Sequence, residues 1–332
     1  AIYATSTSNF DFNSSITVTG GSPGSNYGIA YSGGSGSKIF VKKNGGSSFN
    51  DLYVYNAGSP VIFSSDTTYR NIFAYNSAGI ICNSALTLSG TYGGDGTGSS
   101  TILGLATFGS GAIIASGTMN VLGTTTFGTN FTVGGYGGTT YFNLGASSTN
   151  ATSLTINSGG YFEYQNLSST SPASLSGLTI NSGGTLRHKA NTSVYTNALN
   201  LNIFGNATIN NGGSINISGK GYAGNVTATG SAPALTGGGG SYYGIAGGGG
   251  AYGGAGGQGR NNTTISTSSN PYGSSTAPTD LGASGGAGGS IYAGGAGGGA
   301  VKLNVTGTLR VAYGASINAN GSNGVGSGNY DP

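Results

Sequence analysis

Apolar and polar residues alternate along short runs that recur through the whole chain. Clear examples are Leu199–Ile203, 215–217 and Val301–Val305, in which every second residue is apolar. This period of two is typical of a β-strand with one buried face. The runs end at Gly-Gly, Asn-Gly or Ser-Gly turn sequences, and no window keeps a helical period. We therefore expect an all-β protein made of many short strands.

The runs belong to longer repeats. Residues 154–160 (Leu-Thr-Ile-Asn-Ser-Gly-Gly) recur at 178–184 and, shortened, at 208–213, while Thr-Phe-Gly occurs at 107–109 and 126–128. Repeats of about 20 to 30 residues are typical of one solenoid coil, and coils must stack because one coil cannot bury its apolar face alone. We predict a right-handed β-solenoid with a central stripe of Ile, Val, Leu and Phe. The 21 Tyr residues are expected to form ladders between coils.

A longer repeat brackets a glycine-rich segment. Residues 201–219 match 303–321 at a constant offset of 102, so we expect these two segments to be neighbours in space. Between them, residues such as Tyr252, Ala255 and Gln258 are separated by pairs of glycines. This spacing of three favours a polyproline-II-like (polyglycine) bundle inserted near the C-terminus; the alternative is a flexible Gly/Ser linker. Collagen is excluded because the chain has only seven Pro.

The repeats divide the chain into five predicted units. They are an N-terminal strand that could pair with another subunit, N-terminal solenoid coils, repeat-bearing coils, the glycine-rich insertion and a returning coil: residues 1–20, 21–152, 153–235, 236–300 and 301–332, respectively.

Composition narrows the function. There are 70 Gly, only 5% of residues are charged, and the net charge is +3, too weak for binding nucleic acid through its backbone. No apolar run approaches the roughly 18 residues of a membrane span. The lone Cys82 lies in an apolar run and is interpreted as a small buried hydrophobe. An uncharged Thr-, Asn- and Tyr-rich chain that begins at Ala1 fits a secreted product after removal of its signal, so we expect an extracellular or cell-surface location.

Catalytic chemistry is sparse. No two of the seven acidic residues lie within ten positions of each other, and His188 is the only histidine. Glycosidases need paired carboxylates, so we expect no enzyme and no catalytic, cofactor or metal site. The G-x-G-x-x-G match at 254–259 lacks the strand and helix of a dinucleotide site. Thr124–Thr126 is isolated in the sequence, which argues against ice binding.

Two small basic clusters interrupt the uncharged sequence. One is Arg187, His188 and Lys189, and the other is Lys38, Lys42 and Lys43. We interpret both as solvated turn residues; contact with an anionic glycan is the alternative.

The C-terminal half resembles a known class of surface protein. The residues that carry the resemblance are 294–309 (Gly-Gly-Ala-Gly-Gly-Gly-Ala-Val-Lys-Leu-Asn-Val-Thr-Gly-Thr-Leu) and 315–321 (Ala-Ser-Ile-Asn-Ala-Asn-Gly). They resemble the glycine-rich β-helical, adhesin-like surface or secreted proteins of prokaryotes. The glycine tracts are similar in kind to those of phage tail-fibre tip adhesins. Both resemblances rest on architecture and imply no catalytic residues.

These features together predict a non-enzymatic extracellular structural or adhesive protein. We expect a subunit of a cell-surface filament or matrix, assembled end to end by β-strand addition, whose partners are copies of itself and surface glycans. The alternative is a carbohydrate-binding or carbohydrate-cleaving receptor-binding tip of the phage-fibre kind.

Two sets of functional residues follow. Alternating apolar residues near the N-terminus are predicted polymer contacts: Phe10, Phe12, Ile16 and Val18. Asn-x-Ser/Thr sequons are predicted glycosylation sites: Asn13, Asn130, Asn150, Asn166, Asn191, Asn206, Asn216, Asn225, Asn261, Asn262, Asn304 and Asn320.

Overall fold

The computed structural model is all-β. It describes residues 24–26, 29–31, 38–43, 49–54, 60–75, 77–145, 152–165, 172–224, 247–252, 255–259, 270–274, 276, 278–288 and 292–324. Within these ranges the regular structure consists of strands alone, and no helix that could span a membrane is present.

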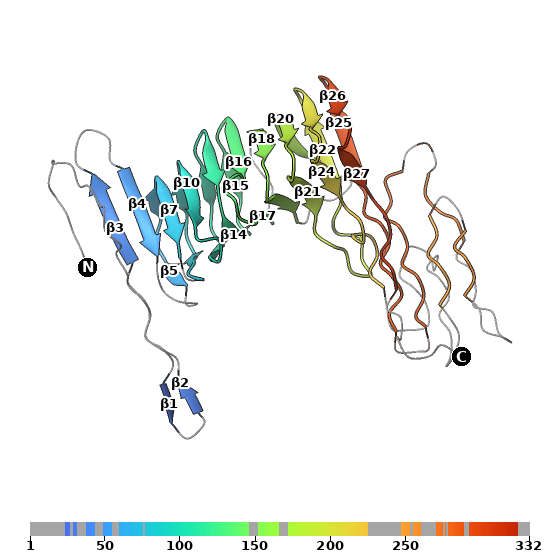
Figure 1. Cartoon of the computed structure of the whole chain (residues 1–332), viewed down its shortest axis with the longest axis horizontal. Coiled ribbons are helices and arrows are strands. Elements are labelled where there is room, and N and C mark those ends of the chain that lie inside the picture. Colours follow the sequence, from blue (N-terminus) through green and yellow to red (C-terminus); the bar gives the residue numbers. More distant parts are fainter. Residues whose placement is uncertain are drawn as a thin grey trace.

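Short parallel strands stack into a β-solenoid, which appears as an arc in Figure 1. The longest sheet has twelve strands: β3 (Lys38–Lys43), β4 (Phe49–Val54), β7 (Asn71–Ala74), β10 (Thr91–Gly94), β13 (Ala112–Ile114), β16 (Asn130–Val133), β18 (Thr152–Ile156), β20 (Ala173–Ile180), β22 (Leu199–Ile203), β23 (Ala207–Ile209), β25 (Val301–Val305) and β26 (Leu309–Val311).

Two further sheets form the other walls. The second sheet has nine strands: β5 (Val61–Phe63), β8 (Ile80–Cys82), β11 (Ser99–Ile102), β14 (Gly117–Val121), β17 (Thr140–Leu144), β19 (Gly160–Tyr164), β21 (Thr185–His188), β24 (Ser214–Asn216) and β27 (Ser316–Asn318). The third has four strands: β6 (Thr67–Tyr69), β9 (Leu86–Leu88), β12 (Ala106–Phe108) and β15 (Thr125–Phe127). A separate hairpin precedes them, made of β1 (Gly24–Asn26) and β2 (Ile29–Tyr31).

Each sequence repeat is one coil of the solenoid, as predicted. Leu154 of β18 pairs with Leu178 of β20, 24 positions later, so the two copies of Leu-Thr-Ile stack residue on residue. Thr107 and Thr126 likewise pair between β12 and β15. Identical residues are therefore neighbours in space because the coils stack in register.

The repeated Gly-Gly turn has a specific structural cause at Gly159 and Gly160. Gly159 has a φ of 73°, which only glycine adopts without strain. A Cβ on Gly160 would collide with the carbonyl oxygen of Val133 in the preceding coil. The first glycine thus turns the chain, and the second lets the backbones of neighbouring coils approach each other.

The alternating apolar residues fill the solenoid interior. Phe131 lies at its centre, with ring-centroid distances of 5.0 Å to Phe108 and 4.9 Å to Phe142. Cys82 is buried in the same core, where burial raises the pKa of its thiol to about 11. The prediction of Cys82 as a small buried hydrophobe is confirmed.

The segments that flank the glycine-rich insertion are neighbours, also as predicted. β22 pairs with β25 in parallel, with Leu201 opposite Leu303, and β24 pairs with β27, with Ile215 opposite Ile317. The chain thus leaves the solenoid after β24 and returns as β25 directly on the coil that it left (Figure 1).

Between β24 and β25, the described glycine-rich segments exchange backbone hydrogen bonds. The Gly221 amide donates to the Gly297 carbonyl over 2.7 Å, and the Gly285 amide donates to the Gly295 carbonyl over 2.9 Å. A Cβ on Gly294 would collide with the Gly285 carbonyl. Side chains are thereby excluded at this close approach.

Truncation of the central phenylalanine should test the core. We expect Phe131→Ala to lower the free energy of unfolding by about 3 to 5 kcal/mol, because it leaves a cavity among stacked rings. Its neighbour Thr132 faces outward, so Thr132→Ala should change stability by less than about 0.5 kcal/mol. Urea unfolding followed by circular dichroism measures both. Equal midpoints for the two variants would contradict this assignment of the core.

Candidate functional site

The C-terminal end of the solenoid exposes its core stripe. Leu309 and Val311 are each 46% exposed and Ile317 is 41% exposed, whereas their counterparts one coil earlier are fully buried. Those counterparts, which pair with them directly, are Ala207, Ile209 and Ile215.

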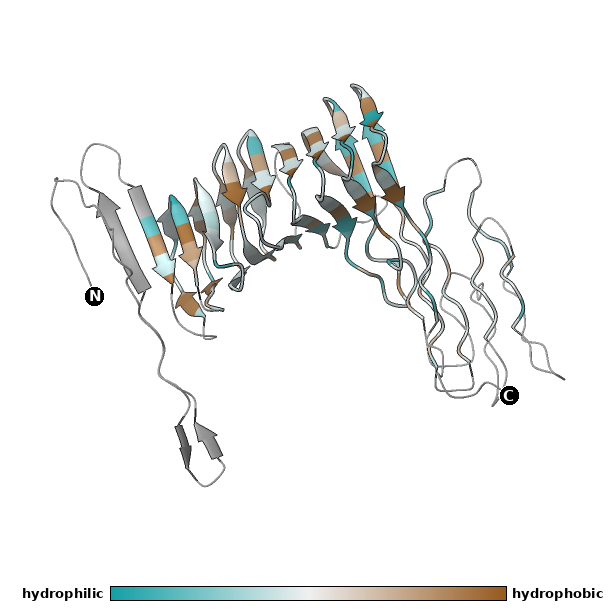
Figure 2. Cartoon of the chain, viewed as in Figure 1, coloured by the Kyte–Doolittle hydropathy of each residue, from teal (hydrophilic) through white to brown (hydrophobic). Residues whose placement is uncertain are grey.

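Figure 2 shows the hydrophobic stripe continuing onto these last strands. In the described part of the chain, no strand pairs with the outer edges of β25, β26 and β27. This coil therefore presents both apolar side chains and unpaired backbone groups.

The opposite end of the long sheet differs from expectation. End-to-end strand addition leads us to expect an open parallel edge here as well, but β3 pairs antiparallel with β4 and ends the parallel stack. β3 carries Lys38, Lys42 and Lys43, which were interpreted as turn residues and lie instead in this edge strand. Lysines on an edge strand oppose further strand addition. The two ends of the solenoid are therefore not equivalent.

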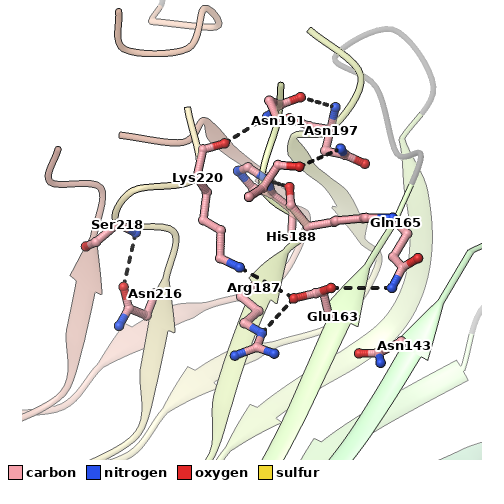
Figure 3. Close-up of polar contacts among 12 residues, drawn as sticks. Asn143, Glu163, Gln165, Arg187, His188, Asn191, Asn197, Asn216, Ser218 and Lys220 are labelled. Atoms are coloured by element: carbon pink, nitrogen blue, oxygen red, sulfur yellow. Dashed lines mark hydrogen bonds and ion pairs between the residues drawn. The ribbon is translucent and has the colours of Figure 1, made fainter. Parts of the chain in front are cut away.

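A cluster of charged residues lies where the glycine-rich segment leaves the solenoid (Figure 3). The Glu163 carboxylate, largely buried, is 2.8 Å from Arg187 Nε and 3.5 Å from Lys220 Nζ. Gln165 Nε2 donates to the same carboxylate over 3.4 Å. Burial is the main cause that lowers the pKa of Lys220, with Glu163 opposing it. The cluster is an internally paired contact between coils.

Tyrosines support this cluster from outside. The Tyr141 and Tyr161 rings stack at 5.0 Å, which confirms the predicted ladder for this pair. The Arg187 guanidinium carbon lies 5.5 Å and 5.2 Å from the two ring centroids. Such cation–π contacts contribute about 0.5 to 2 kcal/mol. The interpretation of Arg187 as a solvated turn residue is therefore wrong, and only Lys189 of this basic cluster is exposed.

His188 is fully buried, which also corrects its assignment as a turn residue. Nδ1 lies 2.7 Å from the Lys189 carbonyl oxygen, so it carries the ring proton. Nε2 has no hydrogen-bond partner, and the backbone of Gly299 covers it so closely that a Cβ there would collide with it. Burial lowers the pKa of His188 to about 4. The neutral ring thus packs directly against Gly299 of the returning glycine-rich segment.

The described carboxylates of the solenoid have local partners. Asp51 binds Arg70 through Nη2 at 2.5 Å and Nε at 3.0 Å. Asp66 accepts a hydrogen bond from Ser84, and Asp95 accepts one from Thr97. No group of three or more potential metal ligands occurs in the described part of the chain.

Threonines form columns that the sequence did not reveal. Thr126, expected to be isolated, is the last of four threonines paired in register across the third sheet: Thr68, Thr87, Thr107 and Thr126. A second column of half-exposed threonines follows the long sheet: Thr132, Thr155, Thr179 and Thr208. Thr126 is therefore not isolated in space. Ice binding by a solenoid would need two threonines, Thr-x-Thr, at the same place in each coil, and these are single columns.

The sequons differ in accessibility. Five asparagines are exposed: Asn130, Asn206, Asn216, Asn304 and Asn320. Asn191 is instead buried, and its Nδ2 donates to the carbonyls of Asn197 and Lys220 over 2.8 Å each. The remaining sequons lie outside the described residues: Asn13, Asn150, Asn166, Asn225, Asn261 and Asn262. So do the predicted polymer contacts: Phe10, Phe12, Ile16 and Val18.

The 24-residue repeat contains the signal that would have found the charged cluster. It places Glu163 opposite Arg187, as the structure does. Lys220 comes from beyond the next turn, and no repeat predicts its position. Comparison of the chain with family models, with curated proteins and with solved structures finds no match.

Glycan occupancy should follow this accessibility. In native protein we expect glycans at the exposed sequons, such as Asn130 and Asn216, and none at Asn191, whose amide is fully engaged. Glycopeptide mapping and intact-mass analysis test this. A native mass equal to the bare 32.2 kDa, or an occupied Asn191 in the folded protein, would contradict it.

Acid should weaken the fold through His188. Its pKa is about 4 in the folded state and about 6.5 in an unfolded chain, so the unfolded state binds the proton more tightly. This contribution is complete above pH 6.5 and is lost as the pH falls toward 4. The difference between the two pKa values corresponds to about 3 kcal/mol. Unfolding free energies of wild type and His188→Gln from pH 7 to pH 4 should diverge by that order; parallel profiles would refute the assignment.

Proposed function

We propose that this protein is a non-enzymatic structural or adhesive subunit of a cell-surface filament or matrix, assembled end to end through β-strand addition. The observation that carries the proposal is the uncovered C-terminal coil. Leu309, Val311 and Ile317 continue the core stripe there but remain about half exposed.

Addition of a strand would cover the exposed apolar side chains of this coil and pair its free backbone groups. A further strand would pair with the free backbone edge of β25 and β26, giving affinity through main-chain hydrogen bonds. Its apolar side chains would cover Leu309 and Val311; burying an aliphatic side chain completely is worth about 1.5 to 3 kcal/mol. Specificity would come from the alternate side chains that face the core.

The two different ends imply a direction of growth. β3 pairs antiparallel and carries three lysines, so it does not offer the long sheet a ready parallel edge. Two uncovered C-terminal coils could pair only about a two-fold axis, which would close a dimer and would not extend a filament. The proposed donor is therefore the N-terminal segment, residues 1–20, in which Phe10, Phe12, Ile16 and Val18 alternate with polar residues.

We infer a right-handed solenoid and a polyproline-II-like bundle in residues 236–300. Support for the bundle comes from the backbone bonds between glycine segments and from the lack of room for side chains at Gly294. The bundle would project from the filament, where it could display the intervening Ser-, Thr- and Pro-rich loop.

An exterior location is supported by surface chemistry. Charged residues make up 5% of the chain, and three exposed sequon asparagines lie in strands: Asn130, Asn216 and Asn304. Columns of Thr, Asn and Tyr would also suit a glycan-binding tip, which is the second candidate. Glycan-array binding by protein that stays monomeric would favour that candidate.

The proposal is tested by assembly of variants. We expect the full chain to form filaments visible by negative-stain electron microscopy, and deletion of residues 1–20 to leave soluble monomers. Leu309→Lys should likewise abolish assembly, because it places a charge in the apolar stripe that the donor must cover.

A matched control separates assembly from folding. Thr306→Lys introduces the same charge on the exposed side of the same coil and should assemble as wild type. If further coils of a longer chain cover the C-terminal coil instead, deletion of residues 1–20 will not change the assembly state. A full-length chain that remains monomeric at micromolar concentration would refute the filament.

A further inference from the structure

The N-terminal segment has the apolar spacing of the uncovered coil. Phe10 and Phe12 precede Ile16 and Val18 by six positions each. In the last coil the core-facing residues have the same spacing: Leu303 and Val305 precede Leu309 and Val311 by six. One offset of 293 positions therefore superimposes all four pairs.

The resemblance extends to the turn that follows. Ile16-Thr-Val-Thr-Gly-Gly has the pattern apolar, Thr, apolar, polar and a glycine pair, as residues 178–184 have with one more turn residue. In the solenoid this pattern forms a strand and its Gly-Gly turn. Residues 10–21 thus carry the sequence pattern of two strands of a coil and the turn that follows them.

Charge also matches across the proposed pairing. Asp11 is the only charged residue among the first twenty. The last coil, residues 301–324, contains two basic residues, Lys302 and Arg310, and no acidic one; both are exposed. The same offset places Asp11 opposite Asn304, between these two cations in sequence.

Resting on the proposed strand addition, we propose that residues 10–18 of a second copy pair in parallel with β25 and β26 in one defined register. Phe10 and Phe12 lie opposite Leu303 and Val305, and Ile16 and Val18 lie opposite Leu309 and Val311. The second copy thereby supplies two strands of the missing coil.

The same chain is poorly placed to supply this segment. In the long sheet, the path from β3 to β25 contains ten strands, including these two. At about 4.8 Å per strand, the position beyond β25 lies about 48 Å along the sheet from β3. The β1–β2 hairpin brings Gly24 opposite Tyr31, which leaves 13 residues between Val18 and Lys38 to cover the distance. Fully extended, they reach about 43 to 47 Å, and the step across the hairpin adds about 5 Å. The chain would therefore span the distance only if every one of these residues were fully extended along the sheet.

Cysteine pairs in the full chain test the register. Thr19→Cys with Ala312→Cys joins residues that the offset places directly opposite, within the Cα separation of about 4.4 to 6.8 Å that a disulfide needs. Thr17→Cys with Ala312→Cys is the matched control. It represents a slip of two residues, which keeps the same face toward the core but moves the partner about 7 to 8 Å away. Cys82 is buried and stays in both variants.

Oxidised samples are analysed by non-reducing electrophoresis and electron microscopy. We expect a ladder of covalent oligomers from Thr19→Cys/Ala312→Cys, and at least tenfold less from the control. Filaments in which the control pair cross-links instead, or in which neither pair does, would overturn the register while leaving the proposed function intact. Cross-linked monomer would show that the chain closes its own end. Absence of both filaments and cross-links would overturn the register together with the function.

Discussion

The whole structure depends on one constraint: each coil must lie one strand spacing, about 4.8 Å, above the last, with its strands in register. Backbone hydrogen bonds between parallel strands impose it. The pairing of β18 with β20 departs from this at one bulge, where Thr152 is opposite Leu175 and Ser153 is opposite Gly177. Under this constraint a residue meets its own counterpart from the neighbouring coil, so threonine stacks on threonine and tyrosine on tyrosine. Asn181 donates to Asn157 over 2.8 Å in the same way. The constraint also forces small residues into the turns, which accounts for the pair Gly159 and Gly160.

Charge is used within this frame to fix particular contacts between coils. Asp51 with Arg70, and Glu163 with Arg187, each join residues of successive coils. Glu163 with Arg187 is the more buried of the two pairs, and removing Arg187 costs more than the pair itself contributes, because the Glu163 charge stays desolvated. Lys220 lies in the segment that leaves the solenoid, and it adds a second cation to the pair of Glu163 and Arg187. These acidic residues, which could be considered for catalysis from the sequence, thus form ion pairs that hold the coils and the exiting segment together.

Repeats made much of the fold predictable. The copies of Leu-Thr-Ile-Asn-Ser-Gly-Gly identified single coils, and the offset of 102 identified the strands that the insertion separates. Features outside the repeat were missed. The antiparallel strand β3 has no copy elsewhere, and nothing local to His188 indicates that Gly299 covers it. An open end with an exposed apolar stripe was expected, but the sequence pattern of Leu309 is that of a buried strand, so nothing local marks it as one of the exposed residues.

The direct pairing of β22 with β25 has a mechanical consequence. Tension along the solenoid axis passes from one coil to the next through these interstrand bonds, so the glycine-rich segment lies outside the load path although it lies within the covalent chain. A filament built from such subunits would bear force through its stacked coils alone. The projecting segment would be free to change length or composition between related chains without weakening the fibre.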